Sequence, residues 1–74
     1  MKATQRQKIA CDVIRDVIGW IIGSNDIHSP TLISDMEEEV SKYWQDDRIN
    51  QYEMNLILLI GYNLIEDIRN MEDK

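Results

Sequence analysis

The residues of this chain that could do chemistry are mainly carboxylates that stand in close pairs. Such pairs are Glu37 with Glu39, Asp46 with Asp47, Glu66 with Asp67, and Glu72 with Asp73. General acid–base catalysis needs carboxyl groups that are held in a cleft and have perturbed pKa values. These pairs fall on the expected solvent sides of helices or between helices, so we interpret them as solvated surface charge.

A metal ion or a nucleophile would have few candidate residues. The segment 46–53 departs from the calcium-loop pattern, because Arg48 takes its third place and no glycine takes its sixth. His28 is the only histidine, and together with Asp26 it offers too few ligands for a metal. Cys11, the only cysteine, lies on the apolar side of a helix without a nearby histidine, and we expect a small core residue. We therefore predict no metal, no cofactor and no enzymatic activity.

The charge of the chain restricts its partners. The net charge is −6, with four basic and two acidic residues in positions 1–16 and four basic and twelve acidic residues in the remainder. Nucleic acids and anionic membranes are bound mainly through Lys and Arg, so we expect neither as a direct partner. The longest dense apolar run, 56–60, is far shorter than the ~20 residues that span a bilayer. With no secretory signal pattern and a single thiol, a cytoplasmic location is expected.

The chain is short, and a short chain can bury only a small hydrophobic core. We treat residues 1–74 as a single helical domain, and a domain of this size buries only about 60% of the surface that its unfolded chain exposes. One cysteine excludes an intrachain disulfide, and no metal cluster is available. Oligomerisation or close helix packing must then supply the stability.

Three helices are expected, over residues 5–22, 30–44 and 51–71, which makes the chain all-α. Apolar residues recur at helical spacing through all three segments. The start signals are a capping box of Thr4 with Gln7, an N-cap at Ser29 before Pro30, and a second capping box of Asn50 with Glu53. Gly23 suits the left-handed conformation that ends many helices, and Gly61 would let a neighbouring helix approach closely.

The third helix has more apolar surface than one contact face needs. Its main apolar stripe comprises Met54, Ile57, Leu58, Ile60, Gly61, Leu64, Ile65, Ile68 and Met71. A second stripe of Tyr52, Leu56, Leu59 and Asn63 has the spacing of a helix–helix seam with one polar position. The first helix has a similar surplus at Ile9 and Trp20, whereas the second, with a narrow stripe that includes Tyr43 and Trp44, has none.

These surpluses favour a homodimeric helical bundle, with the first and third helices at the interface and the second helix outside. Apolar surface of this extent, left in water, usually marks an interaction site. Two alternatives remain open. The second stripe could close a compact monomer through bending or steep crossing of the helices, or a different protein could bind the same surface.

The expected function is that of a small acidic protein–protein interaction module that regulates or inhibits a larger protein, for example as an accessory protein of a phage or mobile element. The candidate partner-binding residues lie on the second helix: Asp35, Glu38, Glu39, Tyr43 and Trp44. One alternative is a nucleic-acid mimic that places Asp35, Glu38, Glu39, Asp46, Asp47, Glu66 and Asp67 in the basic groove of a DNA- or RNA-handling enzyme. The other alternative is a structural subunit whose first and third helices complete another protein's bundle.

Overall fold

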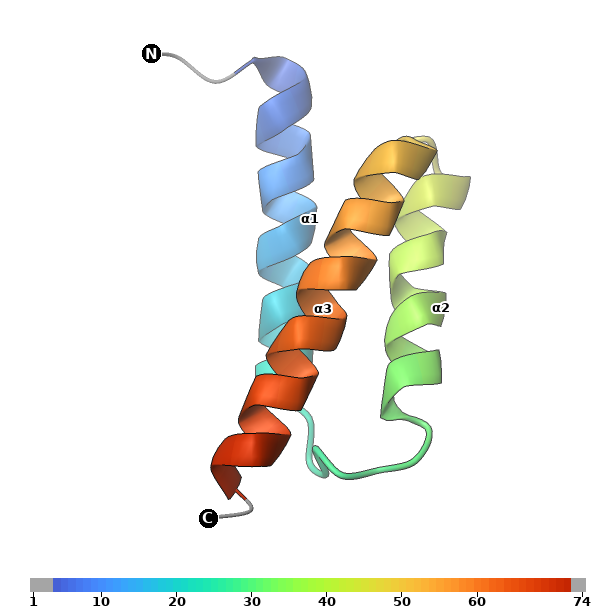
Figure 1. The fold of residues 1–74 in the computed structure, drawn as a ribbon. Helices are drawn as coiled ribbons and strands as arrows, with labels where there is room; N and C mark the ends of the chain where they lie inside the picture. Colours follow the sequence, from blue (N-terminus) through green and yellow to red (C-terminus); the bar gives the residue numbers. More distant parts are fainter. Residues whose placement is uncertain (1–3, 73–74) are drawn as a thin grey trace.

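The computed structural model describes residues 4–72, which form three α-helices joined by two short connections (Figure 1). The helices are α1 (Gln5–Ile22), α2 (Leu32–Gln45) and α3 (Gln51–Glu72). Helices α1 and α3 run in the same direction and α2 runs against them, and each helix contacts both others. Residues 4–72 contain no β-strand. The prediction of an all-α, three-helix chain is confirmed.

Both predicted capping boxes are present. The Gln7 N–H donates to Thr4 Oγ1 (3.1 Å), and the Thr4 N–H donates to Gln7 Oε1 (2.8 Å). At the start of α3, the Glu53 N–H donates to Asn50 Oδ1 and the Asn50 N–H donates to Glu53 Oε1, both at 2.8 Å. These bonds satisfy N–H groups that have no partner within a helix, so the first and third helices begin where expected.

Helix α2 begins two residues later than predicted, at Leu32, and its N-cap is Thr31 rather than Ser29. The Ser29 carbonyl instead accepts the Leu32 N–H in a tight turn (3.2 Å). The guanidinium of Arg69 from α3 also donates to this carbonyl (3.1 Å) and to that of Ile27 (2.6 Å). This contact with a distant part of the chain holds the connection as a turn, and the regular helix starts after it.

The helix ends also differ from the prediction at Gly23. Gly23 caps α1 with a φ of −80°, so it is not in the left-handed conformation, and its N–H donates to the Gly19 carbonyl (2.9 Å). The left-handed residue is Asp47, with a φ of 60° after the end of α2. There the Arg48 N–H donates to the Tyr43 carbonyl and the Asp47 N–H to the Trp44 carbonyl. This pair of bonds is a Schellman motif, and Asp is among the few residue types other than glycine that visit its left-handed position.

The core is built from one row of residues on each helix, spaced by four positions. The rows are Val13, Val17 and Ile21 on α1, Leu32, Met36 and Val40 on α2, and Ile57, Gly61 and Ile65 on α3. Ile27 and Ile49 from the two connections complete the buried apolar cluster. Each helix therefore buries only the strip that faces the other two.

This narrow strip leaves three residues exposed that the sequence pattern placed inside. Cys11 of α1, Trp44 of α2 and Met71 of α3 are all exposed. Two neighbouring helices cannot cover apolar stripes as wide as those of α1 and α3, so the edges of these stripes remain in contact with solvent. The expectation that α2 has no surplus apolar surface is also wrong, because of Trp44.

Gly61 of α3 packs against the side chain of Met36 of α2. A Cβ atom added to Gly61 would overlap the sulfur of Met36, whose side chain is 0% exposed. Because Met36 is enclosed by the core, its thioether cannot move aside into solvent. Gly61 therefore leaves room for a neighbouring side chain, because the atoms that a Cβ would meet belong to the side chains of Met36 and Ile21.

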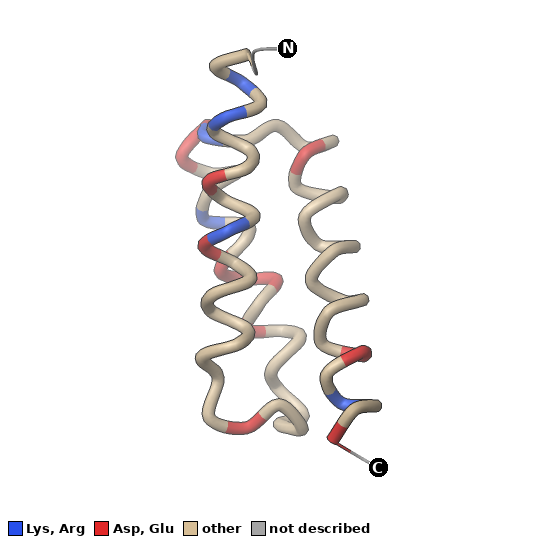
Figure 2. The backbone as a smooth tube through the Cα atoms, turned by 90° about the vertical axis from the view of Figure 1, so that its left-hand side faces the viewer, with Lys and Arg blue, Asp and Glu red and all other residues tan. Residues whose placement is uncertain are grey.

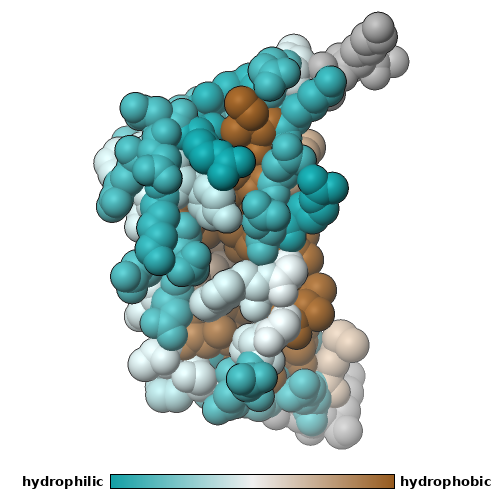
Figure 3. Space-filling model, turned by 180° about the vertical axis from the view of Figure 1, so that it is seen from behind, coloured by the Kyte–Doolittle hydropathy of each residue, from teal (hydrophilic) through white to brown (hydrophobic). Residues whose placement is uncertain are grey.

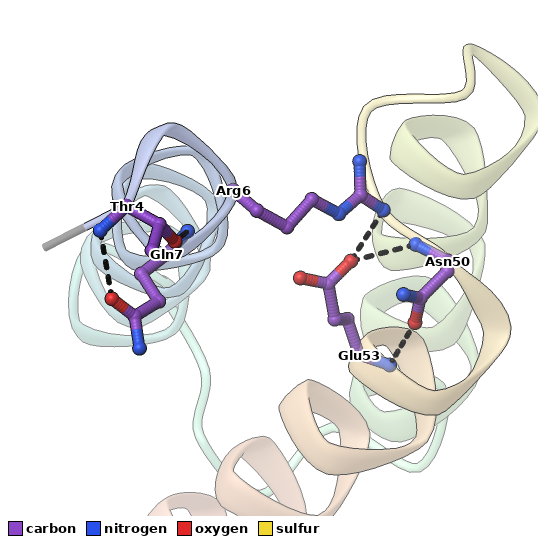
Figure 4. A network of polar contacts seen from close by, with 5 residues as sticks. All are labelled: Thr4, Arg6, Gln7, Asn50 and Glu53. Atoms are coloured by element: carbon purple, nitrogen blue, oxygen red, sulfur yellow. Dashed lines mark hydrogen bonds and ion pairs between the residues drawn. The ribbon is translucent and has the colours of Figure 1, made fainter.

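Glu53 links the start of α3 to the start of α1 (Figure 4). Its Oε1 atom accepts the Asn50 N–H of the capping box and also an N–H of the Arg6 guanidinium, at 2.5 Å. The side chain of Glu53 is only 15% exposed, whereas that of Arg6 is 45% exposed. One carboxylate thus serves both as a helix cap and as an ion-pair partner between helices.

The substitution Gly61→Ala is expected to lower the free energy of unfolding by about 1 kcal/mol. Overpacking a buried site costs about 1–3 kcal/mol, and the better helix propensity of alanine offsets about 1 kcal/mol of this cost. Gly19→Ala is the matched control, because a Cβ there has no atom within 4 Å, and it should stabilise by about 0.5–1 kcal/mol. Urea unfolding followed by circular dichroism measures both. Equal stabilisation by the two substitutions would contradict the close approach at Gly61.

Substitutions of Glu53 should separate its two roles. Glu53→Gln keeps an acceptor for the Asn50 N–H but removes the charge that faces Arg6, and it should cost less than about 1 kcal/mol because the pair is partly exposed. Glu53→Ala removes both contacts and should cost about 1–2 kcal/mol. The difference between wild type and Gln should shrink as salt is added to the urea titrations. A Gln variant as unstable as the Ala variant would show that the cap contributes nothing.

Candidate functional site

The residues predicted to bind a partner do not form one surface on α2. Asp35, Glu39 and Tyr43 are spaced by four and lie on the edge of α2 that faces α1. Trp44 is seven positions from Glu37, whose carboxylate accepts the Tyr62 hydroxyl of α3 (2.8 Å), so Trp44 lies on the edge that faces α3. The structure therefore separates Trp44 from the other candidates, while Glu38 points outward between the two edges.

A small notch lies between α1 and α2. Its walls are Asp16, Val17 and Trp20 of α1 and Glu39 and Tyr43 of α2, and its volume is ≈ 70 Å³. We call it the α1–α2 notch. Two aromatic rings and one valine supply its apolar surface, and one carboxylate from each helix stands beside them. The view from behind shows hydrophilic atoms over much of this side of the molecule, with hydrophobic atoms between them (Figure 3).

The electrostatics of the notch are negative around Tyr43. Burial raises the pKa of the Tyr43 hydroxyl above its ordinary value, and the charge of the Asp16 carboxylate raises this pKa further. The guanidinium of Arg48 lies over the Tyr43 ring, 5.3 Å from its centroid, and lowers the pKa in part. The Tyr43 ring thus already accepts a cation on one face.

The second notch carboxylate, Glu39, has an exchangeable partner. Lys42 Nζ donates to Glu39 Oε1 at 3.0 Å, and this hydrogen bond raises the pKa of Lys42. The two side chains are 57% and 39% exposed. An ion pair this exposed contributes little to stability, so another cation can replace Lys42 at low cost.

The second stripe predicted on α3 is exposed in the chain. Tyr52, Leu56 and Leu59 are 74%, 44% and 54% exposed, and Asn63 is exposed beside them. This row lies opposite the buried row of α3, which points at α1 and α2. The structure therefore brings these four residues together on the outer surface.

The other two residues predicted for self-association, Ile9 and Trp20, lie elsewhere. Both are on the edge of α1 that faces α2, where Trp20 lines the notch. The α1 residues on the edge towards α3 are Ile14, Ile18 and Ile22, a row spaced by four that the sequence reading missed as an interaction surface. Their spacing was a usable signal, but which edge of α1 adjoins α3 depends on the handedness of the bundle. We call this α1 edge together with the exposed α3 row the α1–α3 face.

The remaining chemical candidates are surface features. Within residues 4–72, no group of three or more His, Cys, Asp or Glu residues could hold a metal ion, and no polar side chain is buried. The His28 N–H donates to Asp26 Oδ1 (3.0 Å), which is a turn. None of the three helices is long and apolar enough to cross a membrane.

The carboxylates of the nucleic-acid-mimic alternative do not form one row. They occupy three separate places, namely α2 (Asp35, Glu38, Glu39), the connection after it (Asp46, Asp47) and the last third of α3 (Glu66, Asp67). No known protein family, curated protein or solved structure matches this chain. Its function has to be inferred from its own surfaces.

Proposed function

We propose that this chain is a protein-binding module without catalytic activity, which takes a Lys or Arg side chain of a larger protein into the α1–α2 notch and so regulates or inhibits that protein. The observation that carries the proposal is the pairing of Trp20 and Tyr43 with the carboxylates of Asp16 and Glu39 around one small cavity. Aromatic faces with adjacent carboxylates suit a cationic side chain, because the rings attract its charge and the carboxylates accept its N–H groups.

The size of the notch limits what can enter it. A volume of ≈ 70 Å³ is well below the roughly 300–1,000 Å³ of pockets that bind small molecules, so the notch admits the end of one side chain and not a small-molecule substrate. A guanidinium or ammonium group fits this space, whereas its stem would lie along the exposed groove between α1 and α2. Arg48 over Tyr43 is an internal example of the same contact.

The negative charge around the notch attracts basic groups from a distance. Asp35 of α2 lines an adjoining pocket with Trp20, Asp12 and Glu38 are exposed on α1 and α2, and the whole chain carries a net charge of −6. Such a field attracts basic segments and accelerates their association, while the notch itself gives the contact its position. A module of this kind acts by covering a basic segment that its partner needs for another interaction.

The test compares two variants that lose the same charge. Asp16→Asn with Glu39→Gln removes both notch carboxylates, whereas Glu66→Gln with Asp67→Asn removes two charges from α3, which does not line the notch. The measurement is calorimetric titration with a panel of peptides of about 12 residues that contain Arg and Lys. The notch variant should bind these peptides about tenfold more weakly than the wild type, since each exposed charge contact contributes up to about 1 kcal/mol.

The control variant should lose less than about twofold in affinity, because its charges lie on α3, which contributes no residue to the notch, and exposed charges are screened over a Debye length of about 8 Å at physiological salt. Equal weakening of both variants would refute the notch and leave only general charge attraction. Equal weakening together with displacement of a captured protein by double-stranded DNA would favour the nucleic-acid mimic instead.

A further inference from the structure

The α3 part of the α1–α3 face has an uncharged centre. Residues 54–65 of α3 contain no charged side chain. Figure 2 shows α3 without a charged position between those near its two ends. The exposed apolar residues at this centre are Leu56 and Leu59 of α3, and a patch of this kind marks an interaction surface. Ile22 of α1 is also exposed, but it lies at the end of the face, beside Ile68 and Glu72.

The two ends of the bundle carry net charges of opposite sign. The charged residues at the starts of α1 and α3 are Arg6, Lys8 and Glu53, which is a net basic end, and those near the end of α3 are Glu66, Asp67, Arg69 and Glu72, which is a net acidic end. Because α1 and α3 run in the same direction (Figure 1), the basic residues are at one end of the face and the acidic residues at the other. A second copy that is turned end over end would place its acidic end against the basic end of the first.

We infer that the α1–α3 face binds a second copy of this chain, with the two α3 helices antiparallel about a two-fold axis at Leu59. In this register, residues equally far before and after Leu59 lie opposite each other. Asn55 then meets Asn63 of the other copy, amide to amide, and Tyr52 meets Glu66, hydroxyl to carboxylate. Asn55, Leu59 and Asn63 are spaced by four and are all exposed, so they form one row along the proposed seam.

Charge also selects the antiparallel arrangement over the parallel one. A two-fold axis along the helices would place Lys8 near Lys8 and Asp67 near Asp67, and like charges at such distances repel. The antiparallel arrangement pairs each basic end with an acidic end and aligns the helix dipoles favourably. A polar residue within an apolar seam, here Asn63, is a known way to define the register of such a pairing.

A dimer would need only a modest share of the surface of the chain. The described chain has 5385 Å² of accessible surface, and a standard interface takes about 800 Å² from each partner, which is about 15% of that area. The α1–α3 face is one of the three long sides of a molecule that measures 40 × 28 × 18 Å. The α1–α2 notch lies on another side, so the dimer leaves two notches open.

The first test is the mass in solution. Sedimentation equilibrium at about 50 µM, a concentration at which a micromolar dimer is mostly associated, should give twice the chain mass of 8.7 kDa. Leu59→Glu places a charge on the two-fold axis and should raise the dissociation constant at least 100-fold. Ser34→Glu adds the same charge at an exposed position of α2 and should leave the dimer intact. A monomer for the wild type, or an intact dimer for Leu59→Glu, would overturn the proposal.

The second test does not depend on whether an isolated monomer folds. In a Cys11→Ser background, mild oxidation should cross-link Leu59→Cys to itself, because only residues at the axis meet their own copies. Tyr52→Cys should cross-link to Glu66→Cys when the two variants are mixed, and neither should cross-link efficiently to itself. Self-cross-linking of Tyr52→Cys would refute the antiparallel arrangement, and the absence of any cross-link would refute the interface.

Discussion

The buried contact between Gly61 of α3 and the side chain of Met36 of α2 lies at the heart of the core. The missing side chain at Gly61 leaves room for the buried thioether of Met36, and a Cβ atom there would occupy the same space. Because α3 packs against α2 through this contact, the buried row of α3 faces inward and the opposite row faces solvent. The exposure of Leu56 and Leu59 is therefore a direct consequence of how the core is built.

Polar contacts hold the ends of the bundle, and the buried core is apolar throughout residues 4–72. Arg6 with Glu53 joins the starts of α1 and α3, whereas Arg69 joins the end of α3 to the connection before α2. These contacts are at or near the surface, where each one contributes modestly and can be solvated if it opens. These polar contacts define how far the helices are shifted along one another, while the apolar rows supply most of the buried surface.

The bundle has two sides with different physical character. The α1–α2 side combines carboxylates with the rings of Trp20 and Tyr43, which suits a cationic group. On the α1–α3 face the middle of α3 is uncharged and the two ends carry opposite net charges, which suits a copy of itself. One small chain can make both contacts at once, because each contact uses one of the three long sides of the bundle and the two sides are separate.

Local sequence determined the parts of this protein that depend on neighbours within about four residues. The three helices, the capping boxes at Thr4 and Asn50, and the second stripe of α3 could all be predicted, because capping bonds and helical periodicity act over one turn. The structure confirms the three-helix fold and the exposure of that stripe, whereas self-association and partner binding remain predictions.

Tertiary structure alone decided the features that depend on distant residues. Arg69 holds Ser29 in a turn from forty positions away along the chain, and the narrow buried rows left Cys11 and Met71 outside. The notch could not be predicted either, because a helical pattern has two edges and does not show which edge adjoins which neighbour. The handedness of the bundle placed Trp20 beside Tyr43 and turned Ile18 towards α3, and handedness arises only when all three helices pack together.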